Sequence, residues 1–165
     1  MMGNPSLGWG KTVAQVLRLG RLHFIGAGLL LFLLGALLSI LQGADLVVQR
    51  LLLGYLAFLP AHLSVSYSND YFDTDVDALG RPTLFTGGSG VLIKNPWLRP
   101  WARRLAIGLM VCSVFFGLVF TLLYRYHLWL VGYLLIGNAL GWFYSAPPRH
   151  AMSASFWSRW WCSWP

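Results

Sequence analysis

Glutamate is absent from this chain of 165 residues, so its five acidic side chains are all aspartates. Cysteine is scarce as well, because Cys112 and Cys162 are the only two, which excludes a disulfide framework. Charged residues reach only 10%, against 57% hydrophobic residues and a mean hydropathy of +0.61. This composition excludes an ordinary soluble domain and is typical of a membrane protein. No small-residue cleavage pattern follows the first apolar run, so we expect no cleaved signal peptide.

Long apolar runs take the place of the missing charge. Runs of about 18 or more apolar residues predict helices that span a bilayer. We expect four such spans, at residues 22–41, 46–67, 105–123 and 128–144. The predicted fold class is therefore all-α, a polytopic transmembrane helical bundle. Pro60 lies within the second run and predicts a kink or a break in that helix.

The segments outside these runs divide the basic residues unequally. Residues 1–21 form a basic leader with a weak apolar face, which we expect to lie along the membrane surface. Residues 78–104 are rich in glycine, proline and basic side chains, and we predict a loop there. Ten Lys and Arg residues fall in the leader, this loop and the C-terminal tail, against two, Arg50 and Arg125, elsewhere. The bias predicts that the N-terminus lies in the cytoplasm. The membrane that we expect is a bacterial-type inner membrane.

The aspartates are concentrated in one short stretch, with four of the five in eight consecutive positions. At about 100° per residue, a helix places Asn69, Asp73 and Asp77 on one face. Asp70 lies on the same face, and Asp75 points away from it. Hard oxygen ligands suit Mg²⁺, which takes one or two protein carboxylates and fills its other positions with water and phosphate oxygens. The spacing predicts a catalytic Mg²⁺ site with Asn69, Asp73 and Asp77 as ligands and Asp70 as a helper, at the cytoplasmic face; the alternative is a solvated acidic helix end.

Basic and aromatic residues near this motif indicate a ligand. A metal-loaded carboxylate cluster with several basic residues downstream is typical of a diphosphate site, and the apolar helices could enclose a lipid tail. Such a site would stabilise a diphosphate leaving an allylic carbon, and aromatic rings would stabilise the carbocation. We predict phosphate contacts from Arg81 first and Lys94 next, with a purely topological role as the alternative. The candidate ring donors, each with simple packing as its alternative, are Tyr67, Tyr71, Phe72 and Tyr144.

A polar residue also lies inside the fourth predicted span. Asn138 is flanked there by Gly137 and Gly141, a pair that favours close helix packing. Its side chain is a candidate for a substrate contact in the cavity or for a helix–helix hydrogen bond.

Several sequence features together carry a resemblance to a known family. They are Asn69-x3-Asp73-x3-Asp77 after a spanning helix, the run Asn69-Asp70-Tyr71-Phe72-Asp73, Arg81-Pro82, Gly87-Gly88-Ser89-Gly90 and Tyr144-Ser145-Ala146-Pro147-Pro148. The first resembles the first aspartate-rich motif of the UbiA superfamily of membrane prenyltransferases. The others are most similar to the menaquinone branch, whose members prenylate 1,4-dihydroxy-2-naphthoate. The resemblance covers residues 22–149.

This resemblance implies an activity and its partners. It implies an integral membrane prenyltransferase that moves a polyprenyl group from a polyprenyl diphosphate to an aromatic acceptor. Mg²⁺ would be the cofactor, the bilayer and the two substrates would be the partners, and nucleic acid would not be one. Two alternatives stay open: another acceptor, such as 4-hydroxybenzoate, homogentisate or a non-aromatic alcohol, or a non-catalytic membrane protein that binds divalent cations or diphosphate lipids.

The chain departs from the family pattern at its C-terminal end. The family implies about nine spans and a second aspartate motif, whereas we predict four spans and find no second motif. Residues 150–165 include four Trp within eight positions, and codon arithmetic predicts a shifted reading frame from about His150. An interfacial Trp/Arg anchor is the alternative. We therefore expect the leader at 1–21, the first half of a prenyltransferase domain at 22–149, a non-family tail, and little or no activity in this chain.

Overall fold

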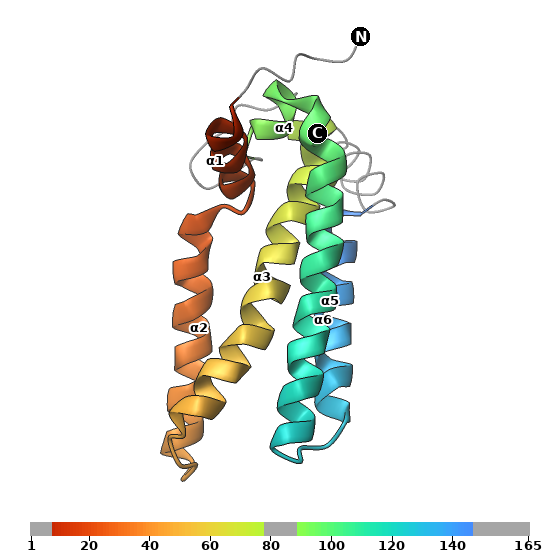
Figure 1. Cartoon of the computed structure of the whole chain (residues 1–165). Coiled ribbons are helices and arrows are strands. Elements are labelled where there is room, and N and C mark those ends of the chain that lie inside the picture. The colour runs from red at the N-terminus through yellow and green to blue at the C-terminus, as the bar shows by residue number, and fades with distance from the viewer. Residues whose placement is uncertain (1–7, 78–88, 147–165) are drawn as a thin grey trace, which may run out of the picture.

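The computed structural model describes residues 8–77 and 89–146, and every regular element within those two ranges is a helix (Figure 1). The long ones are α2 (Leu22–Leu41), α3 (Val48–Asp77), α5 (Arg99–Leu123) and α6 (Trp129–Ser145). The short ones are α1 (Trp9–Leu19), α4 (Val91–Lys94) and the 3₁₀ helix η1 (Pro96–Leu98). The predicted all-α class is confirmed for this part of the chain. Arg81 and the tail at 150–165 lie outside the described residues.

Three helices are long and apolar enough to cross a membrane. Their spanning segments are Phe24–Leu41, Val48–Asp75 and Pro96–Leu123. The fourth predicted span is a shorter apolar helix, Trp129–Tyr144. The 17 residues of α6 give a length of about 25 Å, less than the roughly 30 Å of a hydrocarbon core. The structure thus supports a membrane protein with three full-length apolar helices and leaves the fourth span a prediction.

Of the kink or break predicted at Pro60, the break is wrong, because α3 runs as one helix of 30 residues with Pro60 inside it. The kink stays a prediction. Proline removes a backbone donor and crowds the carbonyls of the preceding turn. A neighbouring helix stabilises that turn: the Ser113 hydroxyl of α5 donates a hydrogen bond to the Ala57 carbonyl oxygen at 2.8 Å. Such help from a partner helix is how spanning helices tolerate proline. As a result the aspartate motif belongs to the same helix as the second apolar run.

The predicted loop at 78–104 is wrong over its last part. Residues 91–94 and 96–98 form α4 and η1, and α5 begins at Arg99. Pro96 and Pro100 lie in the first turns of η1 and α5, where a proline needs no intrahelical partner for its nitrogen. These two prolines, which predict a loop when the sequence is considered alone, mark helix starts instead.

Helix α3 is the centre of the bundle, and it packs on α2, α5 and α6 (Figure 1). Glycines, which have no side chain, allow α6 and α2 to approach α3 closely. A Cβ on Gly141 of α6 would lie 2.6 Å from Val65 Cγ2, and one on Gly28 of α2 would lie 3.0 Å from His62 Cε1. Larger residues at either position would push α3 away from its neighbours.

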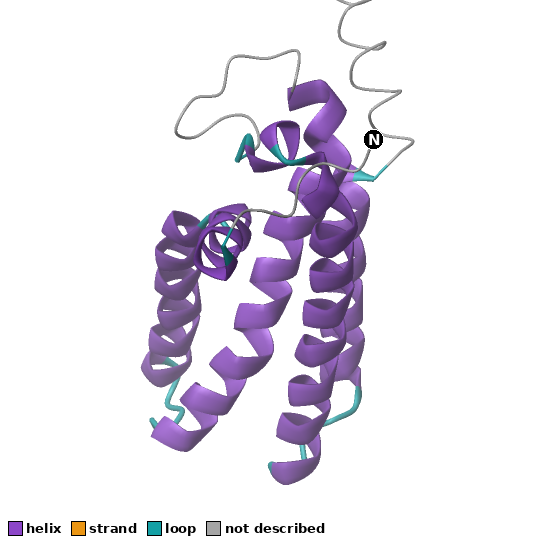
Figure 2. Cartoon of the chain, turned by 45° about the horizontal axis from the view of Figure 1, so that its top comes forward, coloured by secondary structure: helices purple, strands orange, loops and turns teal. Residues whose placement is uncertain are grey.

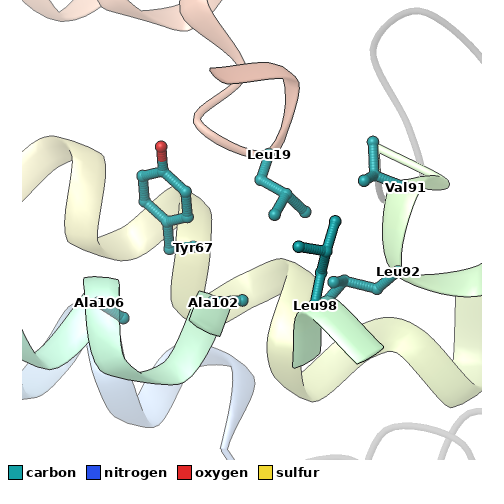
Figure 3. Packing of buried hydrophobic residues seen from close by; sticks show 7 residues of the cluster. All are labelled: Leu19, Tyr67, Val91, Leu92, Leu98, Ala102 and Ala106. Carbon is teal, nitrogen blue, oxygen red and sulfur yellow. The ribbon is translucent and has the colours of Figure 1, made fainter. Parts of the chain in front are cut away.

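Most of the buried hydrophobic residues lie at one end of the bundle, where α1 and α4 join the C-terminal end of α3 (Figure 2). The buried cluster there takes residues from α1, α3, α4, η1 and α5. Figure 3 shows its members, which are Leu19, Tyr67, Val91, Leu92, Leu98, Ala102 and Ala106. Along the rest of the bundle many large apolar side chains face outward, such as Leu30 at 69% and Leu122 at 63% exposure. An outward apolar surface suits contact with lipid.

Candidate functional site

The predicted metal site lies on the last turns of α3. Because α3 is continuous through Asp77, residues four apart are stacked one turn above another on the same face. Asn69 and Asp73 therefore lie one turn apart on one face, and both side chains are half-buried. Asp77 is the last residue of the helix, and its side chain lies outside the described part of the structure.

Asp70 is buried and held by two other segments of the chain. It is 3% exposed, and its Oδ1 accepts a hydrogen bond from Arg21 Nη2 at 2.9 Å. The backbone N–H of Ser89 also donates to it, with the nitrogen 3.2 Å from Oδ1 and 3.3 Å from Oδ2. Both carboxylate oxygens thus already serve as acceptors for protein donors, so a metal would have to share or replace these bonds.

Arg21 makes this contact from an unusual backbone conformation. It lies between α1 and α2 with φ of 44° and ψ of 58°, in the left-handed region. For a residue other than glycine, this backbone conformation costs roughly 1–2 kcal/mol of conformational free energy. The charge-assisted hydrogen bond to a buried carboxylate offsets this cost.

Asp75 lies on the opposite side of α3, as the spacing predicts. Its side chain is 77% exposed, and its Oδ2 is 3.1 Å from Nη2 of Arg99, the first residue of α5. The Arg99 guanidinium also lies over the ring of Tyr71, with 5.3 Å between Cζ and the ring centroid. This exposed pair ties the start of α5 to α3 and is separate from the Asn69–Asp73 face.

The predicted ring donors divide between the interior and the surface. Tyr67 is 7% exposed, and its hydroxyl donates to the Val16 carbonyl oxygen at 3.1 Å. Tyr144 is 68% exposed. Phe72 meets the ring of Trp142 edge-on, with centroids 5.2 Å apart. The burial and the hydrogen bond of Tyr67 favour simple packing, the alternative to its role as a ring donor, and the ring-donor roles stay predictions.

The remaining predicted contacts lie on other elements. Lys94 is the exposed last residue of α4. Asn138 is 4% exposed, and its Nδ2 donates to the Leu134 carbonyl oxygen within α6 at 2.8 Å. Helix α6 runs in the same direction as α3, and Gly141 packs on Val65, so Asn138 lies deeper in the bundle than Asn69 (Figure 1). The structure therefore does not bring Asn138 to the aspartate motif.

The partners of Asp70 are the residues that sequence reasoning missed. Arg21 is 49 residues away and Ser89 is 19 residues away from it. No local spacing rule links such positions. The available signal was the cost of burying an aspartate, which calls for a cation or several N–H donors.

The donor set fits a hard divalent cation. Asn69 and Asp73 supply an amide oxygen and a carboxylate from one helix face, and Mg²⁺ needs few protein ligands because it keeps water. Among the described residues there is no group of three or more His, Cys, Asp or Glu side chains that could hold a metal. The predicted ligands Asn69, Asp73 and Asp77 do not form such a group, because Asn69 is an amide and only the backbone of Asp77 is described.

No family model, curated protein or solved structure matches the chain.

Proposed function

We propose that this chain is the N-terminal part of a Mg²⁺-dependent integral membrane prenyltransferase. It would transfer a polyprenyl group from a polyprenyl diphosphate to an aromatic acceptor, at the cytoplasmic side of a bacterial-type inner membrane. The observation that carries the proposal is the pairing of Asn69 with Asp73 on one face of α3, at the end of an apolar helix bundle. Two further aspartates of the motif, Asp70 and Asp75, are engaged by arginines.

The apolar surroundings favour a lipid diphosphate over a free anion. The motif ends an apolar helix that packs between three others, so a hydrocarbon chain could extend beside α3 while its charged head stays near Asp73. Lipid attachment explains why an oxygen-rich cation site would occur in a chain with only 10% charged residues. A solvated acidic helix end would need no half-buried Asn69 and Asp73.

In this proposal the side chains of α3 hold and orient the substrate. Asn69 and Asp73, with Asp77, would bind Mg²⁺, which when bound neutralises the diphosphate as it leaves. The bond between the allylic carbon and oxygen breaks, and the electron pair leaves with the diphosphate. The aromatic acceptor then forms the new bond with that carbon and loses a proton. Ring faces such as that of Phe72 would stabilise the cation between these events.

The acceptor is proposed from the resemblance of the motif alone. The run from Asn69 to Asp73 favours 1,4-dihydroxy-2-naphthoate and hence menaquinone biosynthesis. A different acceptor, such as 4-hydroxybenzoate or homogentisate, would leave the roles of Asn69 and Asp73 unchanged.

A transfer assay in membranes tests the proposal. The assay supplies Mg²⁺, a labelled polyprenyl diphosphate and a panel of acceptors. It uses this chain and a version in which the reading frame after His150 is restored. We expect transfer only from the restored version, with a loss of about 100-fold or more in Asp73→Ala. Asp75→Ala is the matched control, and it should retain activity because Asp75 lies on the other side of α3.

Two results would contradict the proposal in different ways. Transfer that is equal in Asp73→Ala and Asp75→Ala would remove the motif from the reaction. Mg²⁺-dependent binding of the diphosphate without transfer to any acceptor would favour the non-catalytic binding protein.

A further inference from the structure

One side of α3 holds two neighbouring segments of the chain just below the candidate metal site. Tyr67 and Asp70 are three residues apart and so lie on adjacent turns of the same face. The Tyr67 hydroxyl donates to Val16 in α1 at 3.1 Å, and Figure 3 shows its oxygen directed toward α1. Asp70 accepts from Arg21 at the corner between α1 and α2 at 2.9 Å. The corner is thus fixed at two points.

The same carboxylate also fixes the residue before α4. Ser89 N–H donates to Asp70, and Gly90, with φ of +67°, turns the chain into α4 directly afterwards. The Ser89 hydroxyl accepts from Val91 N–H at 3.3 Å and so caps that turn. Leu19 of α1 and Val91 of α4 belong to the same buried cluster. Asp70 is therefore the polar centre on which α1, α3 and α4 meet.

Asp70 lies beside the proposed ligands on the surface of α3. At about 100° per residue it is about 60° around the helix from Asp73. Lys94, at the end of α4, is five residues from Ser89 along the chain. The hydrogen bond from Ser89 to Asp70 therefore ties the chain just before α4 to α3, close to Asp73.

We propose that Asp70, together with Arg21, is a positioning residue that fixes α4 and the α1–α2 corner beside the Asn69–Asp73 face, and that Asp70 is not itself a metal ligand. The inference rests on the proposed function for the identity of the ligand. It changes the role of Asp70 from a direct helper in metal binding to a residue that acts through Arg21 and Ser89. The support for this role is the burial of Asp70 and the engagement of both its acceptor oxygens.

The first measurement tests the geometry without any ligand. Spin labels are placed at Lys11→Cys in α1 and Ile93→Cys in α4, both exposed positions, in a background with Cys112→Ser and Cys162→Ser. We expect the distance distribution to broaden in Arg21→Gln and in Asp70→Asn. In Arg21→Lys the distance distribution should be narrower than in Arg21→Gln, because lysine keeps the positive charge. Arg99→Gln, which breaks the exposed ion pair on the opposite side of α3, should leave it unchanged.

The second measurement separates a positioning role from a ligand role. The version with the reading frame restored after His150 is titrated with farnesyl thiodiphosphate, a non-hydrolysable analogue, at saturating Mg²⁺. It is then titrated with Mg²⁺ at saturating analogue. We expect Arg21→Gln and Asp70→Asn each to lower the affinity for the analogue by about 10-fold. The Mg²⁺ concentration at half-saturation should stay the same as in the unsubstituted protein. Arg21→Lys should recover part of the affinity, and Arg99→Gln should change it by less than about 2-fold, as expected for an exposed pair.

The outcomes distinguish this inference from the proposed function. A Mg²⁺ midpoint that shifts in Asp70→Asn but not in Arg21→Gln would make Asp70 a ligand and overturn the inference. Unchanged label distances in both variants would overturn it as well. If the unsubstituted protein with the reading frame restored after His150 binds no analogue, the proposed function fails, whereas the label distances in the given chain still decide whether Asp70 positions α4.

Discussion

The two ends of the bundle are held together by different chemistry. At the motif end, a buried apolar cluster joins several helices, and Arg21 forms an ion pair with Asp70. At the other end, the Arg50 guanidinium lies over the Tyr124 ring at 5.1 Å, and Phe120 stacks on Tyr126 with centroids 5.4 Å apart. Directed, charge-assisted hydrogen bonds fix positions closely, whereas ring contacts are broad in geometry.

This difference matches the tasks that the two ends would have. A site that binds a metal and a diphosphate needs its ligands held within a fraction of an ångström. The opposite end carries Tyr124, Tyr126 and Trp129, amphipathic rings that suit the boundary between lipid and water. The motif end should therefore be sensitive to small changes, and the aromatic end should tolerate them.

The largest expected effect is the loss of Arg21. Arg21→Ala leaves the carboxylate of Asp70, 2% exposed in its side chain, without its cation, and removing one partner of a buried pair costs about 3 kcal/mol. Thermal unfolding in detergent measures the loss. The double variant Arg21→Ala/Asp70→Asn is the control, since it removes the charge that was left behind, and it should be more stable than Arg21→Ala alone. A double variant that is equally unstable would show that the pair is not the cause.

A smaller effect is expected at the two glycines with positive φ. Gly90 at the motif end has φ of +67° and Gly43 at the aromatic end has φ of +94°, and a Cβ added to either would meet no atom within 4 Å beyond its chain neighbours. Each change to alanine should cost about 1 kcal/mol of stability through backbone strain alone. Only Gly90→Ala should also weaken the binding of farnesyl thiodiphosphate, because it moves Ser89 away from Asp70. Equal binding in the two variants would remove the distinction between the ends.

The cation–π contact between Arg50 and Tyr124 at the aromatic end should contribute less to the free energy of unfolding than the Arg21–Asp70 pair. Arg50 is exposed, so Arg50→Ala should cost roughly 0.5–1 kcal/mol of unfolding free energy. Binding of farnesyl thiodiphosphate should stay unchanged, because Arg50 lies in the first turn of α3, at the far end from the motif. Arg50→Lys keeps the charge and should lose less. A loss as large as that of Arg21→Ala would contradict the contrast drawn between the two ends.

The smallest effect is expected at the exposed pair of the motif end. Asp75→Asn removes an ion pair whose side chains are 77% and 39% exposed, and such pairs contribute less than about 1 kcal/mol. The effect should shrink further as salt is raised. Unfolding temperatures at low and high salt measure it. A loss that is large and independent of salt would mean that Asp75 has a structural role like that of Asp70.

Sequence patterns were most reliable where one helix was concerned. The separation of Asp75 from the Asn69–Asp73 face follows from helical periodicity, and the structure agrees. The predicted break at Pro60 was wrong, since α3 is continuous and Ser113 of another helix contacts the turn before Pro60, a contact that the local sequence does not reveal. The hydrogen-bond partners of Tyr67 and Asp70 could not be predicted for the same reason, since Val16 and Arg21 are distant in sequence.

The amino-acid sequence by itself determined that this is an apolar helical protein with one acidic motif, because run length, composition and spacing are local properties. It also determined which motif residues share a face of α3. Only the tertiary structure decided which of those residues hold the protein together. Burial and the choice of hydrogen-bond partner depend on segments that meet only after folding, as Arg21, Asp70 and Ser89 do.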